Sequence, residues 1–427
     1  GLNLAMQLEK KGVLRECNTE LLGTSSRSIE RAEDRELFKE LCEEIGEPVL
    51  QSIIAESTEE GLKAAEEIGY PVVLRPAFTL GGTGGGFADN AEECAEILRG
   101  ALELSPVHQV LVEKSIKGYK EIEYEVMRDA NDTAITICNM ENVDPVGIHT
   151  GDSIVVCPSQ TLTNKEYHML RDSALKIIRA LKIEGGCNVQ FALDPLSFNY
   201  YLIEVNPRVS RSSALASKAS GYPIARVSAK ISVGMHLDEI QIANTPASFE
   251  PALDYVVTKM PRFPFDKFSS ANNTLSTQMK ATGEVMSIGR TVEESLLKAA
   301  RSLEIGVNHL YMKKFESFSD DDMLSYIKDG TDDRIYAIAE LLRRKTDIGM
   351  ICNATKIDML FLEKIKNIVR TENRLKEHIG DTDTLYTAKK LGFSDEFIGR
   401  LWGMTGEEIY KIREKHGMFP VYKMIDT

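Results

Sequence analysis

The sequence predicts an α/β region followed by an all-helical region, and two observations support this division. Up to about residue 302, helical segments alternate with short segments that are apolar throughout or alternate strictly between apolar and polar residues. After residue 302 the sequence changes to short helices separated by capping signals. At 427 residues the chain is too long for one typical hydrophobic core, so two or three domains are expected.

The first predicted unit is a helix followed by a short strand. Ser57 and Glu60 form a capping-box pattern that begins a helix, which continues through Ile68 and ends at Gly69. The apolar residues 72–74 then predict a short buried strand.

A glycine-rich loop comes soon after this strand. Residues 81–86 are glycine at every position except Thr83, and glycine lets backbone N–H groups approach an anion closely. The loop is not a P-loop, because no Gly-Lys-Ser/Thr follows it, and it does not match GxGxxG. An ordinary flexible turn and, with Arg75 at the end of the strand, a phosphate-binding loop both remain open.

Two hairpins are predicted further along the chain. Glu121, Glu123 and Glu125 alternate with apolar residues and share one face, with residues 134–140 as the pairing strand. We expect this face to be exposed to solvent, and single out only Glu121. A helix that begins with the capping box at 163–166 precedes the second hairpin, whose strands cover residues 188–193 and 200–205.

The second hairpin carries a candidate metal site. Glu204 and Asn206 lie on one face of their strand, and Asn188 and Gln190 form a second polar pair on the neighbouring strand. A carboxylate and amide oxygens are hard ligands of the kind that Mg²⁺ takes while it also binds phosphates. A solvated strand face is the alternative, but four polar groups on one hairpin face favour a metal–phosphate site.

Two arginines follow these polar residues directly. Arg208 and Arg211 carry planar guanidinium groups that suit a doubly charged oxyanion. Metal ligands that lead into arginines indicate phosphate chemistry on a small anionic substrate.

Composition excludes several classes of function. The formal charge of −14 argues against a nucleic-acid binder, and no apolar stretch is long enough to span a bilayer. No secretory signal is present, and the seven cysteines are scattered without a CxxC pair. Reduced, structural thiols and a cytoplasmic location are therefore expected.

The last part of the chain resembles an assembly module. Thr355 with Asp358 and Thr405 with Glu408 are the clearest helix starts, and residues 391–395 predict a helix–helix turn. This part contains no glycine-rich loop and no cluster of potential ligands, so a packing or assembly role is expected.

Several segments together carry a resemblance to a known family. They are RPAFT at 75–79 with the glycine loop, GIHTGDS at 147–153, NVQFA at 188–192, EVNPRVSRSSALASKA at 204–219, PASFEP at 246–251 and YVVTK at 255–259. Taken together they resemble the large subunit of carbamoyl-phosphate synthetase, in particular its N-terminal, carboxyphosphate-forming half. The resemblance covers nearly the whole chain.

The resemblance implies an ATP-grasp fold, in which two α+β lobes hold ATP between them, followed by a helical oligomerisation domain. It implies a remnant of a pre-ATP-grasp domain at 1–25, the ATP-grasp domain at 26–302 and the oligomerisation domain at 303–427. The lobe that carries the glycine-loop lid is expected at about 50–120.

In this family the corresponding half uses ATP to phosphorylate bicarbonate, and ammonia then converts carboxyphosphate to carbamate. Ammonia comes from a glutaminase subunit or domain, and a second synthetase half uses the carbamate. That second half is missing here, so a fragment is expected, with self-association through the helical domain. Magnesium or manganese is the implied metal, and K⁺ is a further cation that the family allows.

The resemblance also implies roles for individual residues. Those that contact ATP would be Arg35, Arg75, Gly81, Gly82, Lys114, Ile116, Glu121, Gly147, Ile148, His149, Gln190 and Glu204. The metal would be held by Gln190, Glu204 and Asn206, while Asn188, Arg208 and Arg211, with Glu204, would serve bicarbonate and carboxyphosphate. Lys114 stands where some relatives have an acidic residue, so only its backbone is expected to take part.

Two other functions remain open. One is another bicarbonate-activating ATP-grasp ligase of the biotin carboxylase type, against which the helical module argues. The other is a catalytically silent fragment that only assembles with other subunits. The sequence does not distinguish a parent enzyme of arginine, pyrimidine or urea-type metabolism.

Overall fold

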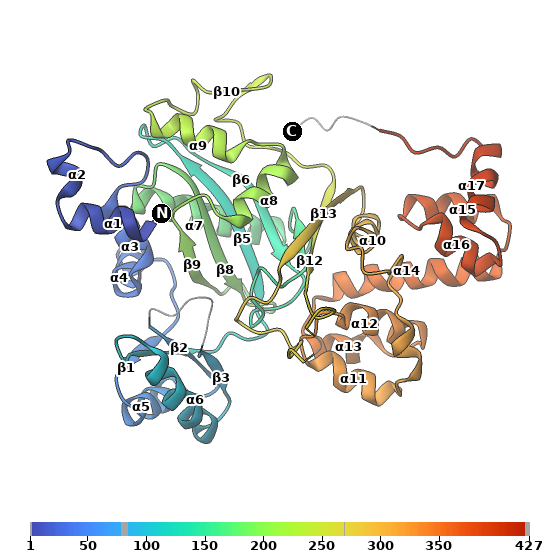
Figure 1. Ribbon diagram of the computed structural model, residues 1–427, viewed down its shortest axis with the longest axis horizontal. Coiled ribbons are helices and arrows are strands. Elements are labelled where there is room, and N and C mark those ends of the chain that lie inside the picture. The colour runs from blue at the N-terminus through green and yellow to red at the C-terminus, as the bar shows by residue number, and fades with distance from the viewer. Residues whose placement is uncertain (1, 78–83, 269, 423–427) are drawn as a thin grey trace.

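The computed structural model describes residues 2–77, 84–268 and 270–422 and divides into three parts (Figure 1). They are a small lobe, a larger lobe built around a seven-stranded sheet, and a helical part. The helices at 26–33 and 35–45 precede the small lobe in the chain but pack on the larger lobe. The prediction of a mixed α/β region followed by helices is confirmed.

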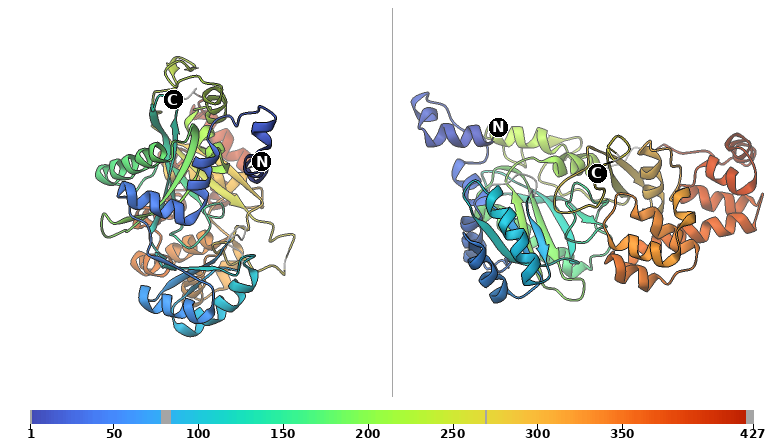
Figure 2. Two further views of the ribbon diagram at one scale, coloured as in Figure 1. Left: turned by 90° about the vertical axis from the view of Figure 1, so that its left-hand side faces the viewer. Right: turned by 60° about the horizontal axis from the view of Figure 1, so that its bottom comes forward.

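The small lobe is a four-stranded antiparallel sheet in the order β1-β4-β2-β3. Its strands are β1 (Ser52–Ala55), β2 (Val72–Pro76), β3 (Gly86–Ala88) and β4 (Val110–Lys114). Helices α5 (Thr58–Ile68) and α6 (Ala91–Leu104) pack on it through a shared apolar cluster that includes Ala65, Leu74 and Leu98. The views in Figures 1 and 2 show this lobe at one end of the larger sheet.

The predicted ends of α5 are confirmed. The Ser57 hydroxyl accepts a hydrogen bond from Glu60 N, and Gly69 is the C-cap. The Glu60 carboxylate reaches back to the N–H of Glu56 and not to that of Ser57, so the reciprocal half of the box lies one residue earlier.

The large lobe contains a seven-stranded antiparallel sheet in the order β13-β12-β7-β6-β5-β8-β9. Its strands are β5 (Lys120–Arg128), β6 (Ala134–Asn142), β7 (Val155–Cys157), β8 (Gly185–Leu193), β9 (Tyr200–Asn206), β12 (Val256–Arg262) and β13 (Gly283–Gly289). Both hairpins expected from the sequence are present, β5 with β6 and β8 with β9.

Helices cover the two faces of this sheet with different apolar clusters. On one face α7 (Asn164–Leu181) packs on side chains that include Tyr124, Val189 and Phe191. On the other face α8 (Arg211–Ser220) packs on β5, β6 and β8, and α9 (Ile224–Ser232) packs on β8. The remaining elements before the helical part are α1 (Leu2–Lys10), α2 (Val13–Glu16), α3 (Ser26–Glu33), α4 (Arg35–Ile45), β10 (Gln241–Ile242) and β11 (Thr245–Pro246).

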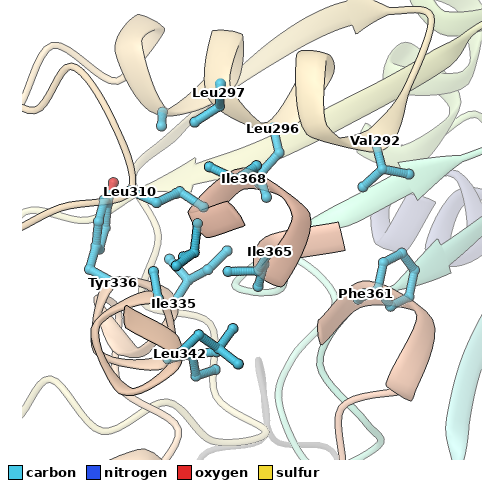
Figure 3. Close-up of a cluster of buried hydrophobic side chains, with 14 of the residues drawn as sticks. Val292, Leu296, Leu297, Leu310, Ile335, Tyr336, Leu342, Phe361, Ile365 and Ile368 are labelled. Carbon is cyan, nitrogen blue, oxygen red and sulfur yellow. The ribbon is translucent and has the colours of Figure 1, made fainter. Parts of the chain in front are cut away.

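The helical part packs around one large apolar cluster, shown in Figure 3. Its elements are α10 (Val292–Ser302), η1 (Lys313–Ser317), α11 (Asp320–Lys328), α12 (Arg334–Arg343), α13 (Ile348–Thr355), α14 (Met359–Glu377), α15 (Thr382–Lys390), α16 (Asp395–Trp402) and α17 (Gly406–Lys415). Val256 and Met260 of β12 belong to the same cluster, so this core is continuous with the edge of the sheet.

One of the two predicted helix starts in this part is wrong. Thr355 is the last residue of α13, where its hydroxyl donates to the Ile351 carbonyl, and the N-cap of α14 is Asp358. Thr and Asp are both good N-caps, so the pattern alone did not separate the end of one helix from the start of the next. The capping box of Thr405 and Glu408 at α17 is confirmed. Among the described residues, no helix combines the length and the apolar character needed to cross a membrane.

Candidate active site

A cavity of about 600 Å³ lies between the small lobe and the large sheet. Residues of β2, β5, β8, β9 and β12 line it, together with the loop after β6 and the segment that leads into α8. Ten of the predicted site residues reach it: Arg75, Glu121, Gly147, Ile148, His149, Gln190, Glu204, Asn206, Arg208 and Arg211. The residues expected to form a site do converge in space.

The register of three strands places polar side chains in two rows. Glu123 on β5 lies opposite Gln190 on β8, which lies opposite Glu204 on β9. One step along, the strands place Glu125, Asn188 and Asn206 in a second row. Side chains at such paired positions project from the same face, so both rows face the cavity side of the sheet.

The predicted metal ligands lie at the cavity end of these rows. The Asn206 amide nitrogen donates to Glu204 Oε1 at 3.0 Å, and Gln190 Nε2 donates to Asn188 Oδ1 at 3.3 Å. Because these bonds use the amide nitrogens, the amide oxygens remain as potential metal ligands.

This set contains a single carboxylate. Accordingly, among the described residues no three His, Cys, Asp or Glu side chains are grouped to hold a metal ion. One carboxylate and two amide oxygens nevertheless fit Mg²⁺, which completes its shell with water and substrate phosphates.

Asn188 lies behind the cavity wall. It is fully buried, and its amide nitrogen donates to both Glu123 and Glu125 at 3.0 Å. It does not line the cavity, so the structure assigns it to the support of neighbouring side chains; contact with bicarbonate stays a prediction.

The expectation of a solvent-exposed glutamate face on β5 is wrong. Glu121, Glu123 and Glu125 are 5%, 3% and 0% exposed. Burial, with a smaller contribution from the neighbouring Glu123, raises the pKa of Glu121 to about 8. Burial also raises the pKa of Glu125 to about 8, although hydrogen bonds from the Ser212 and Ser213 hydroxyls act to lower it. Buried carboxylates with neutral partners leave this face of the cavity short of positive charge.

Three arginines supply positive charge around the cavity. Arg208 and Arg211 follow β9 closely in the sequence; both side chains line the cavity and are exposed to solvent. Arg75, at the end of β2, pairs with Glu113 through a 2.8 Å contact. Charge of both signs therefore lines one space, as binding of a metal–phosphate complex requires.

The loop after β6 carries the predicted nucleotide residues Gly147, Ile148 and His149. His149 Nδ1 accepts a hydrogen bond from Gly151 N at 2.9 Å, which places the proton of the neutral ring on Nε2. Burial lowers the pKa of His149, partly offset by Asp152, and favours this neutral form.

The other predicted nucleotide residues do not reach the cavity or are not described. Ile116 is buried in a separate cluster with Leu50 and Ala192, and Lys114 is exposed at the end of β4. Gly81 and Gly82 lie outside the described residues, as does the side chain of Arg35.

Sequence reasoning missed several residues of the cavity, among them Glu123, Lys259, Met279 and Glu284. A signal existed for Lys259, which interrupts the apolar run of β12 and is only 3% exposed. A buried lysine within a strand calls for specific partners.

The comparisons with known proteins agree with this architecture. The family described as carbamoyl-phosphate synthase L chain, ATP binding domain, matches residues 34–240. The carbamoyl-phosphate synthetase large chain, oligomerisation domain, matches residues 284–417.

Solved structures are similar at low identity. Biotin carboxylase from Campylobacter jejuni, in a β,γ-ATP complex, has a TM-score of 0.57 and 17% identity, covering 84% of this chain and 80% of that one. The biotin carboxylase domain of Hydrogenobacter thermophilus 2-oxoglutarate carboxylase, with MgADP, ADP and bicarbonate, has a TM-score of 0.56 and 18% identity over 70% and 72% of the chains. N5-carboxyaminoimidazole ribonucleotide synthetase, in an ADP complex, has a TM-score of 0.53 and 19% identity, covering 71% of this chain and 77% of that one.

These structural likenesses establish the shared fold, which is the ATP-grasp fold. The two family matches follow each other along the chain in the order ATP-binding domain, then oligomerisation domain. The chain therefore belongs to the carbamoyl-phosphate synthetase large-chain family.

Proposed function

We propose that this chain uses ATP and magnesium to phosphorylate bicarbonate to carboxyphosphate, which reacts with ammonia to give carbamate. The observation that carries the proposal is that Gln190, Glu204 and Asn206, from neighbouring strands, line the same cavity as Arg208 and Arg211. This is the first half of carbamoyl phosphate synthesis.

Gln190, Glu204 and Asn206 would hold Mg²⁺ or Mn²⁺ through oxygen atoms. When bound, the metal would neutralise charge on the ATP phosphates during transfer. ADP, magnesium and bicarbonate occur together in the biotin carboxylase domain compared above, which supports ATP and magnesium as ligands here.

Bicarbonate is the nucleophile of the first step. One of its oxygens forms a bond to the γ-phosphorus of ATP while the bond from that phosphorus to the ADP oxygen breaks. Such a transfer depends on positioning and charge neutralisation more than on a nucleophilic side chain. Arg208 and Arg211, at the cavity opening, would orient the bicarbonate and stabilise the dianionic product.

Ammonia consumes the product in the second step. Its nitrogen forms a bond to the carbonyl carbon of carboxyphosphate while the bond from that carbon to the phosphate oxygen breaks. The nitrogen gives up one proton, which the departing phosphate can take, and carbamate remains. Carboxyphosphate breaks down in water, so the two steps need a closed cavity. The lid expected at the glycine loop, residues 81–86, falls partly outside the described residues and stays a prediction.

The test is ADP release from Mg·ATP with and without bicarbonate. We expect bicarbonate to stimulate release, and Glu204→Ala to lower the stimulated rate on the order of 100-fold or more. Glu408→Ala, which removes an exposed capping carboxylate of α17, is the matched control and should retain the wild-type rate. If Glu204→Ala also retains it, the metal site is assigned to the wrong strand.

Isotope transfer identifies the intermediate. In [¹⁸O]bicarbonate the attacking oxygen stays on phosphorus, so inorganic phosphate formed from carboxyphosphate carries ¹⁸O. ADP release without ¹⁸O in the phosphate would indicate hydrolysis of ATP by water and would contradict the proposal. Stimulation of ADP release by free biotin would instead support the biotin carboxylase alternative.

The proposed partners follow from the same assignment. A glutaminase subunit or domain would supply ammonia, a second synthetase half would use carbamate, and the helical part would join subunits. Sedimentation of the full chain measures this self-association. The domain boundaries at residues 25 and 302 stay predictions.

A further inference from the structure

The loop between β6 and β7 forms one wall of the cavity. Gly147 through Gly151 line the cavity, and the loop returns to the sheet at Val155. Hydrogen bonds to His149 turn the loop back on itself, because Asp152 N and Ser153 N both donate to its carbonyl. The shape of this loop therefore fixes one side of the candidate active site.

Lys259 of β12 forms hydrogen bonds with the backbone of this loop. Its ammonium donates to the carbonyls of Thr150, Gly151 and Ser153 at 2.9, 3.1 and 2.8 Å. Three carbonyl oxygens of a four-residue segment therefore converge on one nitrogen atom.

The three bonds use all three donors of a lysine ammonium. Lys259 has no N–H left for a substrate, although its side chain lines the cavity. Its action must therefore pass through the loop that it holds.

The charges around Lys259 come from several elements. Burial lowers the pKa of Lys259 to about 8, while Glu284 of β13, Glu123 of β5 and Asp152 of the loop raise it and Arg211 lowers it. A buried ammonium is retained at such cost only where its partners need it.

The loop in turn contacts Arg211. A Cβ atom on Gly151 would overlap the Arg211 guanidinium, so the arginine lies directly against the backbone whose carbonyl Lys259 holds. Arg211 Nη2 also lies 2.9 Å from Met279 Sδ, and that sulfur would likewise be within 2.9 Å of a Cβ atom on Gly151. The position of Gly151 therefore limits where Arg211 can lie.

We propose that Lys259 is a positioning residue that sets the 147–153 loop and, through Gly151, the place of Arg211 at the bicarbonate end of the cavity. The role of Arg211 rests on the function proposed above, whereas the hold of Lys259 on the loop does not.

The test combines hydrogen exchange with kinetics in the full chain. In Lys259→Met, we expect the amides of Gly151, Asp152 and Ser153 to exchange at least 10-fold faster and the KM for bicarbonate to rise on the order of 10–100-fold. We expect the KM for ATP to change much less. Lys298→Met is the matched control, since Lys298 also donates to a strand carbonyl, that of Ile288, but lies away from the cavity.

Chemical rescue separates the ammonium from general packing. Lys259→Ala leaves room beside the cavity for propylammonium, which replaces the missing atoms of the side chain. Propylammonium should restore slow exchange of the loop and lower the KM for bicarbonate, whereas propanol, which carries no charge, should not. Equal rescue by both would overturn the positioning role of the charge.

A more conservative variant keeps the proposal testable if Lys259→Met and Lys259→Ala do not fold. Lys259→Gln keeps two N–H donors without charge and should give intermediate exchange and an intermediate KM. Wild-type exchange and KM in a folded Lys259→Met or Lys259→Gln protein would overturn the proposal. Absence of bicarbonate-stimulated turnover in the wild type would contradict the proposed function, while exchange of the loop amides would still decide the hold of Lys259.

Discussion

Buried glutamates occur in both the cavity and the helical core, and their pKa values move in opposite directions. Glu121 and Glu125 of β5 have pKa values raised to about 8. Glu372 of α14 is 1% exposed and its pKa is lowered to about 2, because hydrogen bonds and charges from Arg343 and His309 outweigh the effect of burial. Equal burial thus leads to opposite ionisation.

The partners explain the difference. Arg343 Nε and Nη2 donate to the two Glu372 oxygens at 2.8 Å each, and His309 Nε2 lies 2.9 Å away. Within the described part of the chain, the hydrogen bonds to Glu125 come from neutral donors of Asn188, Ser212 and Ser213. The helical core pairs its buried carboxylate with charged partners and keeps it ionised, whereas burial among neutral donors favours the protonated form of Glu125.

The largest expected effect is on the charge-paired glutamate. Glu372→Gln should lower the free energy of unfolding of the helical part by about 3 kcal/mol, because it removes the bidentate partner of buried Arg343 and leaves the 3.3 Å contact with Glu340 as its ion pair. Trp402, the only tryptophan in the chain, lies in this core, so its fluorescence in a urea titration measures the loss.

Glu125→Gln is the matched comparison in the cavity. At pH 7 the folded protein holds Glu125 mostly protonated, and an amide resembles a neutral acid in size and hydrogen bonding. We expect a loss of about 1 kcal/mol or less, measured by hydrogen exchange of β5 amides. Equal losses in the two variants would remove the distinction between the two regions.

The pH dependence of stability should have opposite signs in the two regions. The pKa of Glu372 is lowered to about 2, and burial lowers the pKa of His309. Below pH 6.5 the folded helical part therefore binds fewer protons than the unfolded chain does. Its stability is therefore full above that pH and falls as acid is added, with Glu372 alone giving a loss of about 1 kcal/mol by pH 4.

The cavity side should respond in the reverse sense. With folded pKa values of about 8, Glu121 and Glu125 keep protons that the unfolded chain releases between pH 4.5 and 8. Their contribution is therefore full below pH 4.5 and is lost as the pH rises through 8. Trp402 fluorescence and exchange of β5 amides, followed in urea at pH 5 and pH 8, report the two trends separately. Parallel trends would contradict the assignment of the charges.

The sequence predicted the faces of the strands but not what covers them. Strict alternation correctly placed Glu121, Glu123 and Glu125 on one face, yet alternation says nothing about burial. The Ser212 and Ser213 hydroxyls that contact Glu125 lie 87 and 88 residues further along the chain. A long-range contact of this kind leaves no local pattern.

The same limit applies to the candidate site. The β8–β9 hairpin was predictable because both strands and their turn are local. The pairing of Gln190 with Glu204 was not, because a register shift between Gln190 and Phe191 produces it. Lys259 was not assigned a role, since its carbonyl partner at Thr150 is 109 residues away. Predicted metal ligands came from one hairpin, whereas the residues that support the cavity come from several elements.

The smallest expected effect concerns two buried tyrosines, one in each region. The Tyr124 hydroxyl donates to the Tyr167 carbonyl at 2.8 Å in the sheet core. In the helical core the Tyr336 hydroxyl is buried and, among the described residues, has no hydrogen-bond partner.

Removing each hydroxyl tests whether Tyr336 stabilises the helical core through apolar packing alone. Tyr124→Phe should cost about 1 kcal/mol, because the Tyr167 carbonyl loses a donor in a buried place. Tyr336→Phe should leave stability unchanged or raise it by up to about 1 kcal/mol, because a desolvated hydroxyl without a partner disappears. Urea titrations followed by Trp402 fluorescence for Tyr336→Phe, and by exchange of β5 amides for Tyr124→Phe, measure both. A loss in Tyr336→Phe as large as in Tyr124→Phe would mean that the Tyr336 hydroxyl has a partner in solution, and that the polar contacts of the helical core extend beyond Glu372, Arg343 and His309.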